Sequence, residues 1–183
     1  MNPDIFGNTE PLPVFFLKPG QLFLNKHKPV QRVKIITILG SCISLILTNE
    51  KRGMAAMCHA FLPYCPAGEN CRGNCQAPYK YVHCALQNML HFFYKRGLRG
   101  KEIKVRLYGG SDMFVPDGEY KKTGKNPSVG RQNSELALTR IRAADLCLTA
   151  CETGGVSGRR ILFFPHSGEI QVRRLKRITG EVY

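Results

Sequence analysis

The sequence predicts an α/β fold, a single-domain layered sandwich of mixed β-sheet with about two to three helices, and three observations lead to it. Residues 33–39 and 43–48 are β-branched apolar runs on either side of a Gly-Ser turn, as expected of buried strands. Residues 79–95 carry apolar side chains at helical spacing, and Gly97 follows them as a helix stop. Glycine turns separate further short runs, which gives at least seven strands in mixed order with two helices.

The remaining elements follow from local patterns. A polar turn leads into a strand over residues 54–61, so that a hairpin returns the chain towards the Gly-Ser turn. Residues 102–108 alternate apolar and polar side chains, as one face of a strand does. A second helix is expected over residues 134–144, with Asn133 as its N-cap. Further strands are expected at residues 146–150, 160–164 and 169–175.

The chain divides into a short lead-in and one domain. Residues 1–13 contain three prolines and no periodicity, which predicts a flexible N-terminal lead-in. Residues 14–183 are expected to form a single domain, since a chain of 183 residues can bury a full core without staples. Within that domain, residues 64–78 form a loop insertion rich in Pro, Gly and Cys.

Composition excludes several classes of protein. No apolar run approaches the roughly 20 residues that a membrane span requires, so no membrane insertion is expected. The N-terminus lacks the basic and apolar regions of a signal peptide, which favours a cytoplasmic location. The eight cysteines are then expected to be mostly reduced, and thiol chemistry or metal binding is favoured over a disulfide framework.

The formal net charge of +14 indicates an acidic partner. Part of the charge is concentrated near the C-terminus, in Arg159-Arg160 and in residues 173–177. Nucleic acid and the acidic surface of receptor helices are both possible partners, and a solvated basic face with no dedicated partner is the third reading. Charge alone does not separate them.

The segment around Cys42 has the residues of a cysteine nucleophile. A thiol attacks as its thiolate, and an imidazole, here that of His59, is the usual means of forming one. Gly40 permits a tight turn, so that the backbone N–H groups of Ser41 and Cys42 can face a developing oxyanion. The alternatives are a buried structural thiol at position 42 and a hydrogen-bonded core imidazole at position 59.

A set of motifs in a fixed order carries a family resemblance. They are Phe15-Phe16-Leu17-Lys18-Pro19-Gly20, Thr37-Ile38-Leu39-Gly40-Ser41-Cys42, Met57-Cys58-His59-Ala60-Phe61-Leu62-Pro63, Tyr81-Val82, Leu107-Tyr108-Gly109-Gly110-Ser111-Asp112-Met113, Gly130-Arg131-Gln132-Asn133, and Gly154-Gly155 with Gly158-Arg159-Arg160. Over most of its length the chain resembles CheD, the chemoreceptor glutamine deamidase of bacterial and archaeal chemotaxis. The resemblance implies that Cys42 is the nucleophile, His59 the general base and acid, and Thr37 the residue that orients the imidazole.

The resemblance also implies a reaction and partners. The expected enzyme is a protein-glutamine glutaminase, which converts glutamines of methyl-accepting chemotaxis receptors to glutamate through a thioester on Cys42 and releases ammonia. The same nucleophile could hydrolyse glutamyl methyl esters. The alternative is a binding module that docks on the receptor or on a CheC-type phosphatase with weak or no catalysis. A nucleic-acid binder is disfavoured, because no recognised motif is present; a Cys–His peptidase is chemically adjacent.

Four further cysteines, Cys65, Cys71, Cys75 and Cys84, lie within 20 residues. Such a set can hold zinc or an iron–sulfur cluster, but the intervals match neither a CxxC pair nor a standard cluster motif. The family pattern lacks this feature. Metal binding, unliganded thiols and a disulfide all stay open, and no cofactor is expected for the deamidase reaction.

Overall fold

The computed structural model describes residues 11–25, 32–71, 73–112 and 127–176. Within these ranges it contains nine strands, two α-helices and three short 3-10 helices. The strands are β1 (Val14–Phe16), β2 (Leu22–Asn25), β3 (Lys34–Leu39), β4 (Ile43–Asn49), β5 (Met54–Cys58), β6 (Lys104–Gly109), β7 (Cys147–Thr153), β8 (Arg159–Phe164) and β9 (Glu169–Arg174), and the α-helices are α1 (Val82–Tyr94) and α2 (Val129–Ala143).

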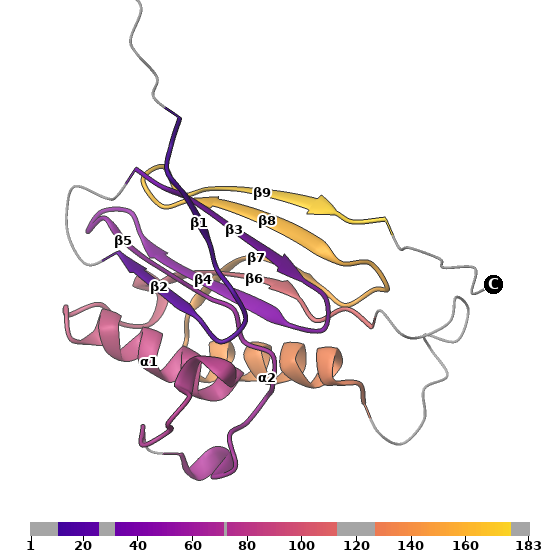
Figure 1. The fold of residues 1–183 in the computed structure, drawn as a ribbon. Helices are drawn as coiled ribbons and strands as arrows, with labels where there is room; N and C mark the ends of the chain where they lie inside the picture. The colour runs from indigo at the N-terminus through magenta and orange to yellow at the C-terminus, as the bar shows by residue number, and fades with distance from the viewer. Residues whose placement is uncertain (1–10, 26–31, 72, 113–126, 177–183) are drawn as a thin grey trace, which may run out of the picture.

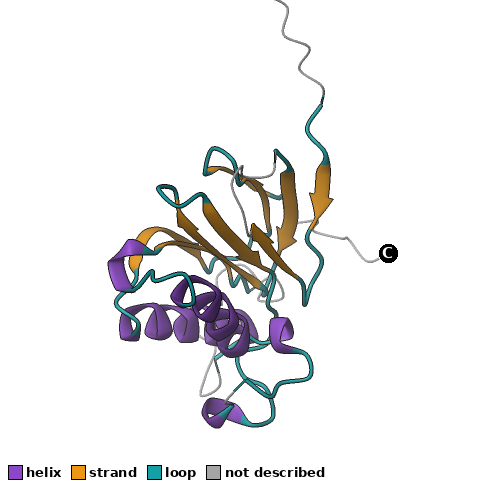
Figure 2. Ribbon diagram, turned by 90° about the vertical axis from the view of Figure 1, so that its left-hand side faces the viewer, coloured by secondary structure: helices purple, strands orange, loops and turns teal. Residues whose placement is uncertain are grey.

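The elements form three layers. An outer sheet has the strand order β1-β3-β8-β9, and a central sheet has the order β2-β5-β4-β6-β7. Both sheets are mixed, since β1 is parallel to β3 and β6 is parallel to β7. Figure 1 shows the outer sheet above the central sheet and both α-helices below it, and Figure 2 shows the same layers from the side. The predicted layered α/β fold is confirmed.

Two cores hold the layers together. Between the sheets, Ile35 and Leu39 of β3 meet Ile46 of β4, Met57 of β5 and Phe163 of β8. Between the central sheet and the helices lies a larger cluster, which includes Leu45, Leu47, Leu86, Met89, Phe93, Leu136 and Ile141. Because β4 contacts both cores, its apolar run is continuous rather than alternating, as in a strand buried on both faces.

Several boundaries differ from the sequence predictions. The strand expected over residues 54–61 ends at Cys58, and the helix expected over residues 79–95 begins at Val82 after a 3-10 turn. The short strands β1 and β2 were not predicted. The predicted lead-in falls largely on residues 1–10, which lie outside the described residues.

The start of α2 corrects one prediction. The helix begins at Val129, and Ser128 is its N-cap because its Oγ accepts a hydrogen bond from the Arg131 amide at 3.1 Å. Asn133 is therefore inside the helix and not its cap. The first turn is polar and contains a glycine, so it lacks the apolar period by which the rest of the helix was recognised.

Candidate active site

The chain between β3 and β4 crosses from the outer sheet to the central sheet, and this crossing is the Gly40-Ser41-Cys42 turn. β4 then forms the predicted hairpin with β5. The ladder pairs Ile46 with Met57, and a bridge pairs Ile43 with Ala60. The hairpin therefore brings His59 back beside the start of β4.

The register places Cys42 and His59 on one face of the central sheet. Ser44 lies opposite His59 in the pairing, and Cys42 is two residues from Ser44, which makes it a diagonal neighbour of His59. The contacts agree, because Cys42 packs against the core between the sheets whereas Ile43 belongs to the core between the central sheet and the helices. Diagonal neighbours are typically about 7–8 Å apart at Cα and within reach of a long side chain.

Thr37 of β3 faces His59 across the space between the sheets. Its Oγ1 lies 2.8 Å from His59 Nδ1 and donates to the carbonyl oxygen of Leu17, also at 2.8 Å. Because the single hydroxyl proton goes to Leu17, Thr37 accepts from the imidazole, and Nδ1 must carry the hydrogen. The Leu17 carbonyl, 3.2 Å from Nδ1, favours the same tautomer. Nε2 is then left as the lone-pair nitrogen.

The segment that precedes β2 fixes the imidazole from a second side. The Gly20 amide donates to the His59 carbonyl at 2.8 Å, and the His59 amide donates to the Gln21 carbonyl at 3.0 Å. This segment also carries the Leu17 carbonyl. His59 is thus held through its backbone and through Nδ1, which limits its rotation.

Burial sets the resting protonation states. The pKa of His59 is lowered by burial, which outweighs the opposing effect of the Leu17 carbonyl. The pKa of the half-buried Cys42 thiol is raised by burial. The resting pair is therefore a neutral imidazole and a neutral thiol. His59 Nε2 is buried and has no hydrogen-bond partner among the described residues, so the two side chains are on one face but not hydrogen-bonded. Catalytic contacts in a free enzyme often tighten only with substrate.

Two backbone amides and one side-chain amide fix the three carbonyls of the turn. Those of Gly40 and Cys42 accept from the amides of Ser111 and Gly110, each at 2.8 Å, just beyond β6. The carbonyl of Ser41 accepts from Asn133 Nδ2 of α2 at 3.0 Å. In a trans peptide the N–H group is opposite the carbonyl. The N–H groups of Ser41 and Cys42 therefore point away from these donors.

The end of β6 comes so close to the Cys42 carbonyl that position 109, which lies in one of the family motifs, requires glycine. Gly109 has a φ of +109°, and a Cβ at this position would overlap the Cys42 carbonyl oxygen. Gly109 pairs with Ile43 at the first position of β4. A side chain here would push on the turn that carries Cys42.

Comparison with known proteins identifies the family of this chain. A family model described as "CheD chemotactic sensory transduction" matches residues 62–174. A "Probable chemoreceptor glutamine deamidase CheD 2" of Geobacter sulfurreducens is 33% identical over 170 residues, which cover 93% of this chain and 95% of the relative. The chain belongs to the CheD family. The match is long enough to include the segment from Thr37 to His59, which precedes the part matched by the family model.

Two other CheD relatives extend over similar lengths. A "Probable chemoreceptor glutamine deamidase CheD" of Rhodospirillum rubrum is 31% identical over 92% of this chain and 85% of its own length. One of Maridesulfovibrio salexigens is 27% identical over 88% of this chain and 92% of its own length. Among the described residues, no helix is long and apolar enough to cross a membrane.

Asn133 is a site residue of this CheD chain that sequence reasoning missed. Its Nδ2 donates to the carbonyl of Ser41 and, at 3.2 Å, to that of Phe61, two residues after His59. One fully buried amide thus joins the Gly40-Ser41-Cys42 turn to the segment that carries the imidazole. The available signal was a polar residue among the apolar positions of α2, but its partners are 92 and 72 residues away in the sequence.

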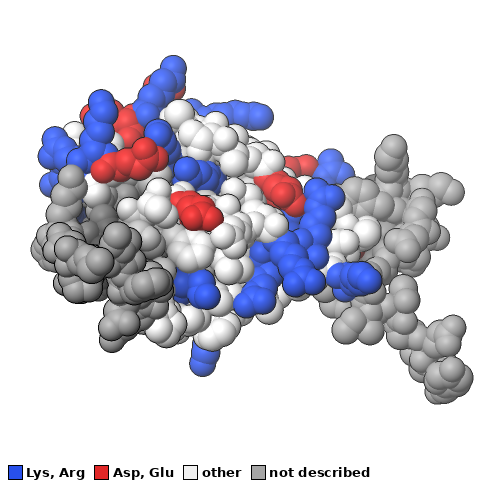
Figure 3. Space-filling view, turned by 90° about the horizontal axis from the view of Figure 1, so that it is seen from above, with Lys and Arg blue, Asp and Glu red and all other residues white. Residues whose placement is uncertain are grey.

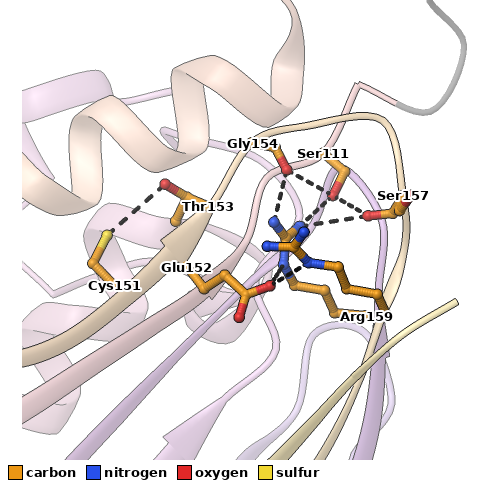
Figure 4. Close-up of polar contacts among 8 residues, drawn as sticks. Ser111, Cys151, Glu152, Thr153, Gly154, Ser157 and Arg159 are labelled. Atoms are coloured by element: carbon orange, nitrogen blue, oxygen red, sulfur yellow. Dashed lines mark hydrogen bonds and ion pairs between the residues drawn. The ribbon is translucent and has the colours of Figure 1, made fainter.

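Arg159 is one of the basic residues near the C-terminus, but it is buried and is not part of an exposed basic face. The side chain is buried, its Nε pairs with Glu152 at 3.0 Å, and its two terminal nitrogens donate to Ser111 Oγ at 2.6 Å and to the Gly154 carbonyl at 2.9 Å. Figure 4 shows the guanidinium at the centre of these contacts. Since the Ser111 amide donates to the Gly40 carbonyl, Arg159 supports the Gly40-Ser41-Cys42 turn through Ser111.

The structure also places Cys58 and the four cysteines of the loop. Cys58 packs between the central sheet and the helices, on the face opposite His59, and burial raises the pKa of its thiol to about 11. Cys65, Cys71, Cys75 and Cys84 come together at one point. A pocket of about 630 Å³ is lined by this cysteine loop, and Cys42 is not among its residues.

Proposed function

We propose that this chain hydrolyses the side-chain amide of glutamines on chemoreceptors. The names of its relatives give the reaction and the substrate. The observation that carries the assignment of residues is the 2.8 Å contact between Thr37 and His59, because it leaves Nε2 as a proton acceptor on the sheet face that Cys42 shares. On this proposal residues 14–183 form one deamidase domain.

In the first half-reaction His59 Nε2 takes the thiol proton as the sulfur of Cys42 attacks the amide carbon. The oxyanion that forms accepts hydrogen bonds from the Ser41 and Cys42 amides. These amides point away from the protein's own donors because the carbonyls on the other side of the same peptides are held by hydrogen bonds. The imidazolium then gives its proton to the leaving nitrogen. The carbon–nitrogen bond breaks, ammonia departs, and a thioester remains on Cys42.

In the second half-reaction water replaces ammonia. His59 Nε2 takes a proton from water, the resulting hydroxide adds to the thioester, and the same two amides stabilise the oxyanion. The carbon–sulfur bond then breaks, the imidazolium returns its proton to the sulfur, and glutamate is released. A glutamyl methyl ester would give the same thioester with loss of methanol, so an esterase activity of this site follows from the same chemistry.

The acidic methylatable helices of a receptor suit the charge of this chain. In Figure 3, which looks down on the outer sheet, Lys and Arg are more widespread than Asp and Glu. Arg160 and Arg173 are cross-strand partners on β8 and β9, and Arg174 follows on β9. Such a surface favours encounter with acidic segments. Because the proposed substrate is the cytoplasmic part of a receptor, we propose that the enzyme acts in the cytoplasm.

A docking function is the second candidate, and the edge of the outer sheet favours it. Val14, Phe15 and Phe16 of β1 and Ile38 of β3 are exposed, with Phe16 exposed to 63%. Apolar side chains gathered at a sheet edge are typical of a protein-binding surface. A receptor or a CheC-type phosphatase is the partner we assign to it, and docking and catalysis can reside in the same chain.

Mass spectrometry of a receptor cytoplasmic fragment tests the proposal. The fragment is incubated with the unaltered protein, with Cys42→Ala and with Cys151→Ser, an exposed thiol that serves as the matched control. Amide-to-acid conversion at specific glutamines is expected with the unaltered protein and the control only. Conversion by Cys42→Ala would exclude the proposed nucleophile. Binding of the fragment by all three proteins without conversion by any would leave only the docking function.

A further inference from the structure

The four cysteines of the loop before α1 lie outside the proposed reaction. Cys65, Cys71 and Cys75 come from the loop between β5 and α1, and Cys84 from the first turn of α1. Their Sγ atoms all lie within 4.8 Å of one another. Figure 1 shows this loop in magenta below the helices, on the side away from both sheets.

The sulfur positions fit a tetrahedral metal better than any disulfide. Cys71 and Cys84 Sγ are 3.7 Å apart. A tetrahedron with zinc–sulfur bonds of about 2.3 Å has edges of about 3.8 Å, whereas a disulfide requires about 2.05 Å. All four thiols are free. A four-iron cluster would need wider spacing, because each of its cysteines binds a different iron atom.

The loop has few buried side chains of its own. Between residues 62 and 81 the buried side chains that the structure describes are those of Cys65 and Cys71. The local cluster contains only the four cysteines and Tyr81. A loop of this length without a core needs a cross-link to keep one conformation. Metal binding is the cross-link that four converging thiols offer, since a structural zinc ion contributes directly to the stability of the fold that holds it.

We propose that Cys65, Cys71, Cys75 and Cys84 bind one structural zinc ion, which fastens the loop to the start of α1. Four thiolates fill all four positions of the ion, so the site is closed and has no open position for catalysis. Gly68, in the left-handed region at φ +59°, closes a turn in which its amide donates to the Cys65 carbonyl at 2.8 Å. This inference does not depend on the deamidase reaction.

Elemental analysis of the full-length protein, purified without chelator from zinc-supplemented cells, tests the site. We expect about one zinc per chain in the unaltered protein and in the control Cys151→Ser, and at least a tenfold lower content in Cys71→Ser and Cys75→Ser. Unaltered protein that contains no metal, or that contains iron instead of zinc, overturns the proposal. Equal zinc in all four proteins overturns the choice of ligands.

A second measurement on the unaltered protein covers the case in which the serine variants fail to fold. Thiol alkylation is mapped by mass spectrometry before and after treatment with a strong zinc chelator. We expect the four cysteines to be protected before treatment and to become modified after it, while modification of Cys147 and Cys151 does not change. Cysteines that react equally before and after treatment overturn the proposal, whatever the deamidase activity.

Discussion

Removing the side-chain amide of Asn133 tests whether α2 holds the Gly40-Ser41-Cys42 turn in place. In Asn133→Ala the carbonyls of Ser41 and Phe61 each lose a donor. Neutral hydrogen bonds contribute about 1 kcal/mol each, so the free energy of unfolding should fall by about 2 kcal/mol. For a chain of this size that lowers Tm by roughly 4–8 °C. The peptide between Ser41 and Cys42 can then rotate, so the direction of the Cys42 N–H group is no longer fixed.

The effect on catalysis follows from that amide. Loss of an oxyanion donor costs about 10²–10³ in kcat, and since Asn133 only positions the donor we expect a fall of roughly 10- to 100-fold. The assay is ammonia release from a receptor fragment at 25 °C, with kcat and KM separated. Leu136→Ala is the matched control, because it destabilises the same helix from its apolar face without touching the turn. Equal losses of kcat in both variants would refute a positioning role for Asn133.

Three further predictions concern the imidazole. In Thr37→Val, which keeps the shape of the side chain, kcat should fall about 10-fold. This is less than the 10²–10⁴ for loss of a general base, because the Leu17 carbonyl still accepts from His59 Nδ1. An unchanged kcat in steady-state assays would contradict the role of Thr37 in orienting the imidazole. The lowered pKa of His59 means that the base stays neutral on mild acidification, so kcat/KM should fall with a midpoint below about 6.5. In the same range the unfolded chain binds the proton first, so chemical denaturation should show stability falling as the pH drops below about 6.5. A midpoint above 6.5 would contradict the burial argument.

The parts of the site that could be predicted are those encoded locally. A glycine and a serine between two β-branched runs mark a turn, and the polar residues 49–53 mark the hairpin that returns His59. Thr37 came from the family resemblance, and its contact with His59 depends on packing one sheet on the other. No local pattern encodes that distance. Ser44 illustrates the same limit: its place opposite His59 depends on the register.

What could not be predicted depends on long-range contacts or on weak patterns. β1 and β2 were missed because they are three and four residues long and flank a Pro-Gly turn. The irregular intervals of the loop cysteines left metal, thiol and disulfide open, and only the folded loop brings their sulfurs together. Arg159 reads as surface charge from its neighbours in the sequence, whereas its partners come from β7 and from the segments after β6 and β7.

The conformation of the Gly40-Ser41-Cys42 turn therefore depends on the whole fold. Gly40 and Cys42 are held by the segment after β6, Ser41 by α2, and the segment after β6 in turn by Arg159 of β8. These partners are separated from the turn by about 70 to 120 residues of sequence, and they come from both sheets and the helical layer. Loop closure over such lengths is costly and is offset only when the layers pack. The proposed oxyanion donors are thus oriented only in the packed structure, where burial also favours the neutral forms of the thiol and the imidazole.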